Sequence, residues 1–415
     1  MKRNSIALAA LAVACGGALA QSTPATVTVY GILDAGITHT TGLATEKNQL
    51  VSGIMEGSRF GLRGNEDIGG GYRAIFTLEH RLELNNGTVS NRPPSGLQVP
   101  DRLGQAALLG LPGALQPAVT GVAGNIAQTL GVNLGNSFWD RQAYIGLVTP
   151  VGAILAGRQY TPAYEINATF DTLGTQSSLS AGQVASVPSS VDIRASNAVQ
   201  YRIVLGGLTA GVMYAFGGNS ANSKANRFGG AMVMYKTPQF AVGLGMNQRN
   251  NDIGQKSLKS TVLGASASVG PGTISGIYGT VEDDNPSGVS AIAGSLAPLV
   301  GSAGATLVQS AFTNALRQDG TLMHLGYKMP VGKNTLYVAY SAFNDKRAPN
   351  ADVASYGVAY TYSLSSRTDL NAVLTHFDNK NLAQAAPGQA GFLGGFTRSA
   401  GTDSNSLALG IRHRF

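Results

Sequence analysis

The sequence contains a single cysteine, Cys15, and only 12% of its 415 residues are charged. The cysteine lies in a segment with the parts of a secretory signal peptide: a basic start, an apolar stretch over 6–13 and a small-residue cleavage site ending at Ala20. We therefore predict a signal peptide over 1–20 and a mature domain over 21–415 without cysteine. Such a chain cannot form disulfides, so packing and hydrogen bonds must stabilise it. Lipidation of Cys15 is the alternative, although the preceding residues match a lipobox only loosely.

Basic clusters and long uninterrupted apolar runs are also missing. The net charge of +7 is mild, and no basic cluster is interleaved with aromatic residues, so nucleic acid is not an expected partner. The most apolar segments, 106–127 and 289–312, are both interrupted by proline. We predict a long loop at 289–312 rather than a membrane helix. The five histidines show no metal-ligand spacing, which predicts neither a metal nor a cofactor.

From residue 26 onward, strand-length stretches alternate apolar and polar residues. Their connections are alternately short and long, and the short ones are rich in glycine, proline and asparagine, as tight turns are. The predicted strands are 26–38, 58–66, 72–83, 141–148, 153–159, 197–205, 208–216, 228–236, 240–249, 260–269, 273–281, 321–328, 335–343, 354–363, 368–377 and 406–415. The side of the sheet that each residue faces is unclear in 141–148, 153–159, 228–236 and 273–281.

This alternation fits either a sandwich or a membrane barrel, and three further features favour the barrel. The strand number is even with short turns at one end, a signal peptide directs the chain to the periplasm, and most strands approach the length that crosses a hydrocarbon core. The fold class predicted is all-β, a 16-stranded antiparallel transmembrane β-barrel. Lipid leaves no backbone group unpaired, so 26–38 must close against 406–415.

The hairpin over 57–83 shows which face would meet water. Arg59 and Arg63 share one face of the first strand, and Arg73 and Arg81 share one face of the second, while the opposite faces are apolar. A sixteen-stranded barrel is too wide for its side chains to fill. We therefore predict that these arginines point into an aqueous channel and that the apolar faces contact lipid.

Four stretches resemble the general diffusion porins of β-proteobacterial type: "VTVYGILDAGI", "GSRFGLRGNEDIGGGYRAIFTLE", "RQAYIGLVTPVGAILAGRQYTP" and the terminal "GIRHRF". The resemblance covers essentially the whole mature chain. It implies a homotrimer in the Gram-negative outer membrane, in contact with membrane lipid and lipopolysaccharide. It also implies that loop 160–196 is inserted into the lumen as a constriction loop, and that terminal Phe415 is recognised by the outer-membrane assembly machinery.

The same resemblance adds Arg141 and Arg158 to the arginines that line the channel. Opposite them, the constriction loop would present Glu165, Asp171 and Asp192. Six arginines against three carboxylates predict a modest preference for anions, because arginine-lined pores favour anions. The alternative for any single arginine is a structural ion pair with Glu66, Asp67 or Glu79.

The predicted function is passive diffusion of small hydrophilic solutes and ions through a water-filled channel, not catalysis. A solute-specific channel is the first alternative. A barrel enzyme using Ser366 and His376, or a secreted β adhesin, is less well supported. Loops 84–140 and 282–320 are longer and more apolar than the resemblance predicts; they would cap the mouth, pack at the trimer axis or form short helices.

Overall fold

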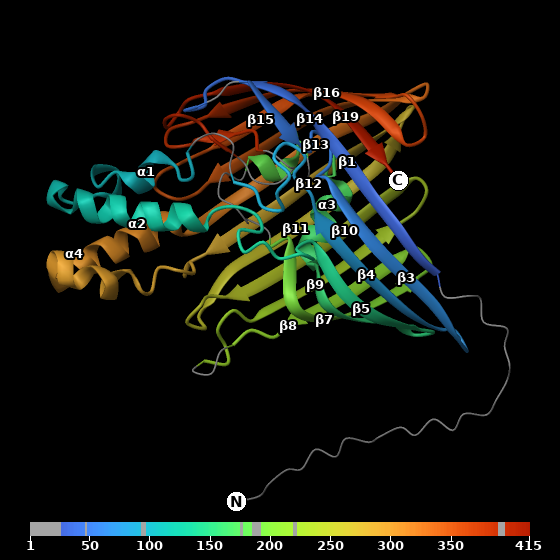
Figure 1. Ribbon diagram of the computed structural model, residues 1–415, viewed down its shortest axis with the longest axis horizontal. Helices are drawn as coiled ribbons and strands as arrows, with labels where there is room; N and C mark the ends of the chain where they lie inside the picture. Colours follow the sequence, from blue (N-terminus) through green and yellow to red (C-terminus); the bar gives the residue numbers. More distant parts are fainter. Residues whose placement is uncertain are drawn as a thin grey trace, which may run out of the picture.

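A computed structural model describes residues 26–45, 48–92, 97–174, 177–184, 192–218, 222–388 and 395–415. The predicted signal peptide lies outside these residues. The described chain forms a tilted, closed sheet with a helical projection at one end (Figure 1). The strand register makes the closure explicit: β1 (Thr26–Thr40) pairs with β19 (Ser404–Arg414), for example Ile37 with Leu409. The predicted closure of the first strand on the last is thus confirmed.

The sheet contains seventeen strands, of which sixteen make up the barrel. The additional strand, β2 (Asn48–Ser52), is short and pairs with the second half of β1, whereas β3 pairs with the first half. The remaining barrel strands follow in sequence order: β3 Arg59–Gly69, β4 Tyr72–Arg81, β5 Gln142–Thr149, β6 Gly152–Tyr160, β7 Arg194–Leu205, β8 Leu208–Ala215, β9 Phe228–Lys236, β10 Phe240–Asn250, β11 Lys256–Val269, β12 Gly272–Asp283, β13 Gln318–Val331, β14 Asn334–Asp345, β15 Val353–Ser363 and β16 Thr368–Asn379. All sixteen predicted strands are confirmed. A two-stranded ribbon, β17 (Ala385–Ala386) and β18 (Gly395–Phe396), lies in the last long connection.

The two faces of the sheet differ as the sequence predicts. On β15, Val358 and Tyr360 are 43% and 37% exposed, whereas Ser355 on the other face is fully buried. The outer wall is therefore a continuous apolar surface suited to lipid. The closed sheet also pairs the backbone groups of its strands with one another, so the wall needs no water to satisfy them. The four strands of unclear orientation are now resolved by their exposed apolar residues, which are Ile145, Ile154, Val233 and Tyr278.

Helix α3 (Pro162–Phe170) lies inside the barrel, against the inner face of β9–β12 (Figure 1). Glycines on these strands make the close approach possible. A methyl group added at Gly245 would lie 2.8 Å from the carbonyl oxygen of Pro162, and one added at Gly264 would overlap the ring of Phe170. Ile166 and Phe170 are fully buried against this glycine surface. The wall and the inserted helix therefore fit each other only because these wall positions lack side chains.

Beyond α3, a buried histidine fixes the inserted segment to the wall. His324 on β13 accepts a hydrogen bond from the Thr172 amide through Nε2 at 3.1 Å, and its Nδ1 lies 2.8 Å from the Ser341 hydroxyl. A short 3-10 helix, η3 (Ala181–Gln183), continues the segment along the wall, against β13 and β14. The predicted insertion at 160–196 thus has several separate attachments to the barrel.

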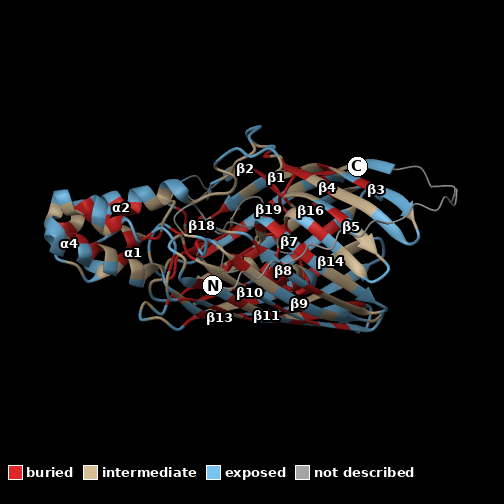
Figure 2. Cartoon of the chain, turned by 90° about the horizontal axis from the view of Figure 1, so that it is seen from below, coloured by how far each residue is buried: buried red, intermediate tan, exposed pale blue. Residues whose placement is uncertain are grey.

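The helical projection is built from the two unusually long connections. Helices α1 (Asp101–Gly104) and α2 (Gln116–Thr129), with 3-10 turns η1 (Ala107–Leu109) and η2 (Gly113–Leu115), pack against α4 (Ile292–Leu316). They enclose a small apolar core of their own around Val119, Val308 and Phe312. Figure 2 shows buried stretches within these helices. The projection stands at the end with the long connections, which faces outside the cell in barrels of this type.

The predicted loop at 289–312 is wrong, because α4 occupies most of it. Within the described residues, α4 is also the one helix long and apolar enough, by length and composition, to cross a membrane. It is instead kinked at Gly301, whose φ of 71° interrupts the helix, and it packs on α2. Pro298 lies three residues before this break, and burial of the apolar stripe against α2 stabilises the two helical segments despite the local preference.

Candidate functional site

Strand register places four of the predicted arginines on one face of the β3–β4 hairpin. Arg59 pairs with Arg81, and Thr77 pairs with Arg63, so these side chains project to the same side as Glu79. Arg73 has the same parity on β4, nearer the short-turn end. The opposite face carries Leu62 and Leu78. This side is the inner wall, because it faces α3 across the lumen rather than the exposed apolar surface.

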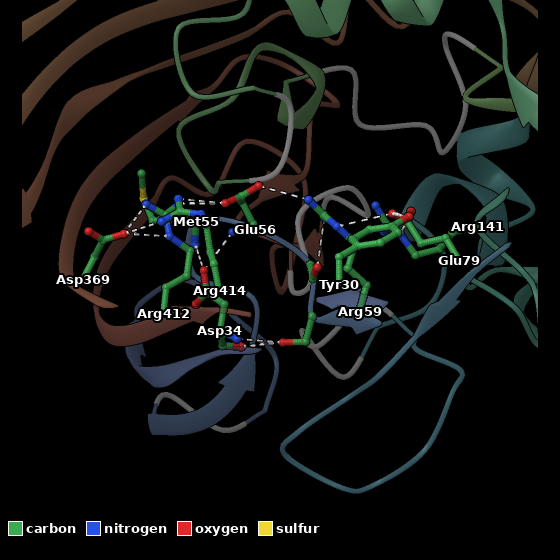
Figure 3. Close-up of polar contacts among 12 residues, drawn as sticks. Tyr30, Asp34, Met55, Glu56, Arg59, Glu79, Arg141, Asp369, Arg412 and Arg414 are labelled. Atoms are coloured by element: carbon green, nitrogen blue, oxygen red, sulfur yellow. Dashed lines mark hydrogen bonds and ion pairs between the residues drawn. The ribbon is translucent and has the colours of Figure 1, made fainter. Parts of the chain in front are cut away.

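Glu79 is the centre of the first polar cluster on this wall (Figure 3). Its carboxylate accepts a hydrogen bond from Arg141 Nε at 2.6 Å and lies 3.6 Å from Arg59 Nε. The hydroxyl of Tyr30 donates to the same carboxylate at 3.0 Å. Arg141 also donates to the hydroxyl of Tyr160 at 3.2 Å. Two guanidinium groups therefore share one carboxylate, which leaves this cluster positively charged.

Glu56 is the centre of a second cluster, at the seam where the barrel closes (Figure 3). Its carboxylate lies 3.0 Å from Arg412, 3.2 Å from Arg414 and 3.1 Å from Arg59. Both C-terminal arginines also bind Asp369 on β16, at 2.9 and 2.7 Å. Arg59 joins this cluster to the one around Glu79, so a continuous band of ion pairs crosses the inner wall.

The backbone that carries Glu56 is held by Asp34. Residues 53–58 separate β2 from β3 and turn back over the inner face of β1. The fully buried carboxylate of Asp34 accepts hydrogen bonds from the amides of Ile54, Met55 and Glu56, each at 2.9 Å. Three charge-assisted bonds fix this turn, so Glu56 is held in position among its arginines.

Arg63 contacts an aromatic ring instead of a carboxylate. Its guanidinium lies 4.0 Å from the centre of the Tyr30 ring, and no carboxylate among the described residues forms an ion pair with it. Arg73 is exposed near the short-turn end. Neither Glu66 nor Asp67 forms an ion pair with these arginines within the described chain, whereas Glu79 does so with two others.

Arg81 has a structural position at the base of the helical projection. It binds Asp140 at 3.0 Å and Glu83 at 3.4 Å, so it joins the two ends of loop 84–140. Burial raises the pKa of Glu83 to about 7, against the opposing effect of Arg81. The strand register places Arg81 on the inner face, as predicted, but its guanidinium binds carboxylates at the ends of the loop.

Arg158 lies at the end of β6, and its place on the inner wall stays a prediction. Strand parity does not place its side chain, because the register of β6 against β7 shifts between residues 157 and 159. Its guanidinium donates to the backbone oxygen of Asp140 and to Ser196 near the strand end. The blurred alternation of this strand had left its direction open, and a register irregularity between residues 157 and 159 explains the ambiguity.

The three predicted carboxylates of the inserted segment do not face the arginine band as free charges. Glu165 on α3 forms an ion pair with Arg202 of β7, and Asp192 lies 2.9 Å from Arg249 of β10. Asp171 is used within the segment, where it accepts the amides of residues 173 and 181 at 2.8 and 2.7 Å. Burial raises the pKa of Glu165, while Arg202 acts in the opposite direction.

Comparison with known proteins identifies the architecture around this band. A family model described as Gram-negative porin matches residues 7–382 of the chain. The chain belongs to the Gram-negative porin family. This porin is 25% identical over 433 residues to the outer membrane porin protein 32 of Delftia acidovorans, an alignment that covers 100% of both chains.

Solved structures of outer-membrane proteins show the same fold. An anion-selective porin from Comamonas acidovorans superposes with a TM-score of 0.68 at 22% identity, covering 94% of this chain and 100% of the other. OmpT of Vibrio cholerae, an outer membrane protein solved in a trimer form, gives a TM-score of 0.58 at 14% identity and covers 95% of this porin and 100% of its own chain. Such likeness supports the barrel fold and does not transfer residue roles.

Several charged residues of this porin escaped the sequence analysis. Arg202 and Gln200 lie on the same face of β7, and the other face of this strand is apolar. The alternation of polar and apolar residues could therefore have predicted that Arg202 points into the channel. The pairing of Glu56 and Asp369 could not be predicted in this way. Their shared partner, Arg412, lies on the last strand, which is distant from both residues in the sequence. Tyr160 accepts hydrogen bonds from Arg141 and Arg194, which extends the band to β7.

The residues of the barrel-enzyme alternative lie far apart in this porin. Ser366 is in the short turn before β16, and His376 is near the other end of that strand, where its Nδ1 lies 2.8 Å from Asn405. Ten residues along a strand span about 33 Å. The two side chains therefore cannot act as a nucleophile and its base.

Proposed function

We propose that this porin is an outer-membrane channel for passive diffusion of small hydrophilic solutes and ions, with a modest preference for anions. The observation that carries the proposal is the band of ion pairs on the inner wall. It joins four guanidinium groups, those of Arg59, Arg141, Arg412 and Arg414, to the three carboxylates of Glu56, Glu79 and Asp369, and a fifth, that of Arg194, is attached through the hydroxyl of Tyr160. Counting the buried Asp34 nearby still leaves an excess of positive charge.

The size of this excess supports a modest preference. Most arginines share a carboxylate, so their fields partly cancel at the distance of a passing ion. Arg63 adds a charge without an ion-pair partner in the described chain. Arginine stays protonated at every physiological pH, so the preference for anions would persist across that range. The anion-selective Comamonas porin, with the same fold, is consistent with this assignment.

We also propose that the channel assembles as a homotrimer, with Phe415 as its recognition signal for outer-membrane assembly. Phe415 is 44% exposed at the short-turn end, and its backbone pairs with Gly31 of β1. An exposed terminal ring at the closing strand is accessible to an assembly factor before the barrel closes. The trimer form of the Vibrio protein is the structural precedent for the oligomeric state.

Planar-bilayer recording across a salt gradient tests the function. We expect current steps in groups of three and a reversal potential of anion sign. The variant Arg63→Glu should shift that potential toward cations without loss of conductance, because Arg63 has no ion pair to break. The control Arg367→Glu, in an exposed short turn, should shift it much less. A cation-sign potential for the unmodified channel would refute the proposed selectivity.

A further inference from the structure

The inserted helix does not cover every strand of the inner wall. It packs mainly on β9–β12, and β7 lies three strand positions from β10 in the sheet. Three interstrand spacings along the wall amount to about 14 Å, so α3 leaves the inner face of β7 largely uncovered. A connection between the helix and this strand therefore needs long side chains from both.

Glu165 and Arg202 make this connection. Glu165 projects from α3, and Nη2 of Arg202 on β7 donates a hydrogen bond to its carboxylate. The same nitrogen lies 3.6 Å from the sulfur of Met232 on β9, which limits the directions that the guanidinium can take. The side chains of Arg202 and Glu165 are 30% and 21% exposed, so a solute in the lumen can reach the pair.

Two spaces border this ion pair. A cavity of about 450 Å³ lies toward β3–β7 and has Arg63 and Gln142 in its lining. A recess of about 400 Å³ lies toward β9 and has Ala168 of α3 and Met234 in its lining. Both volumes fall in the range of small-molecule sites, so each space by itself limits the size of a solute that it can hold.

The boundary between the cavity and the recess consists of the residues that line both, which are Tyr160, Glu165 and Arg202. Tyr160 is held in place, because its hydroxyl accepts hydrogen bonds from Arg141 and Arg194, each at 3.2 Å. Nε of Arg202, in contrast, has no hydrogen-bond partner within the described residues. The ion pair is therefore the part of the boundary that can open.

We propose that the ion pair of Glu165 and Arg202 is a bridge across the lumen that sets the size limit of the channel. While the pair is intact, a solute that passes α3 must fit within one of the two spaces. When the pair is broken, the cavity and the recess join into one opening of nearly twice the volume. The inference rests on the proposed function as a diffusion channel, and it assigns the size limit to two side chains.

Liposome swelling with uncharged sugars tests this assignment, because such solutes do not respond to the altered charge of a variant. Arabinose and lactose compare a pentose with a disaccharide. In Glu165→Ala and in Arg202→Ala, the ratio of the lactose rate to the arabinose rate should rise about twofold, since entry depends on pore width and the two volumes are nearly equal. An unchanged ratio in both variants would overturn the proposal.

A charge-swapped variant separates the bridge from other effects of substitution. Glu165→Arg combined with Arg202→Glu rebuilds an ion pair across the same gap and leaves the net charge unchanged. The lactose-to-arabinose ratio should therefore return toward that of the unmodified channel. A ratio as high as that of the single variants would show that pairing of the two side chains is not what limits solute size, which also overturns the proposal.

Asp192→Asn is the matched control. Asp192 also belongs to the inserted segment, and its carboxylate lies 2.9 Å from Arg249 of β10. Neither of these residues is among the described residues that line the cavity or the recess. Loss of this pair should leave the sugar ratio unchanged. A rise as large as that in Glu165→Ala would show that any loosening of the inserted segment widens the channel, and the bridge would be refuted.

The outcomes also distinguish this inference from the proposed function. If arabinose enters the liposomes and the variants do not change the ratio, only the bridge fails. If neither sugar enters liposomes that contain the folded protein, the diffusion channel itself fails. Partly exposed ion pairs add little to stability, so the single variants should assemble. Should Glu165→Ala not assemble, Arg202→Ala and the charge-swapped variant still decide the question.

Discussion

The carboxylate of Glu56 lies 3.0 Å from the guanidinium of Arg412, although 356 residues separate them in the sequence. Barrel closure brings the turn after β2 against the last strand, so the charge pattern of the inner wall depends on a contact between the two ends of the chain. Asp34 fixes the backbone of that turn through its amides. The seam of the barrel is therefore both a structural joint and a part of the charged lining.

Glu56→Gln should strengthen the preference for anions. The substitution removes one negative charge from among three arginines while the backbone bonds to Asp34 remain. At roughly 8 Å in water, loss of one negative charge changes the energy of an anion and that of a cation by about 0.5 kcal/mol in opposite directions, so the anion-to-cation permeability ratio should rise about fivefold. Reversal potentials in a salt gradient measure this ratio. An unchanged or lower ratio would show that Glu56 does not face the ion path.

Acidification should also strengthen the anion preference, through Glu165. Because burial raises the pKa of Glu165, its carboxylate gains a proton at a higher pH than an ordinary glutamate does. Below that pH, Arg202 has no counter-charge, and the cavity becomes more positive. The permeability ratio should therefore rise as the pH is lowered from 7. In Glu165→Gln the ratio should already be high at pH 7, and the pH-dependent increase should largely disappear.

Gly264→Val should displace the inserted helix. The new side chain would overlap the ring of Phe170, which is fully buried against this position. We expect a larger single-channel conductance and faster entry of larger sugars in liposome swelling, since α3 no longer packs against the wall. Gly229→Val on β9 is the matched control, because nothing lies within 4 Å of a methyl group added there. Equal conductance in the two variants would contradict the packing argument.

Phe312→Ala should unfold the helical projection and leave the barrel intact. Phe312 is fully buried in the apolar core between α2 and α4, and such truncations cost about 3–5 kcal/mol. A core this small cannot absorb that loss. Limited proteolysis should then cut within 84–140 and 282–320, while the heat-stable barrel band on gels and the channel conductance persist. Loss of the barrel band would show that the projection supports the barrel.

Removal of Phe415 should impair delivery to the outer membrane more than folding. Its ring lies near Gly31, and its backbone closes the last pair between β1 and the chain end. We expect less assembled protein in cells, measured by the heat-modifiable band in outer-membrane fractions. Refolding of the purified variant into detergent should proceed with a nearly unchanged yield. Equal losses in the two assays would assign Phe415 a structural role instead of a signal.

The sequence by itself determined the barrel, because strand alternation is a local property. Each apolar face, such as that of Val358 and Tyr360, needs a lipid-like environment, and the spacing of turns determines where each strand begins and ends. The arginines of the β3–β4 hairpin could be oriented in the same way. Helix α4 could not be predicted, since its formation depends on packing against α2, which lies far away in the chain.

Only the tertiary structure decided which charges meet. Glu56, Asp369 and Arg412 become neighbours when the barrel closes, and Glu165 finds Arg202 when the inserted helix reaches the glycine surface of the opposite wall. The sequence supplies the parity of a residue along its strand but not the distance between residues on different strands. Electrostatic interaction depends on that distance, so the charge balance of the channel is a property of the closed barrel.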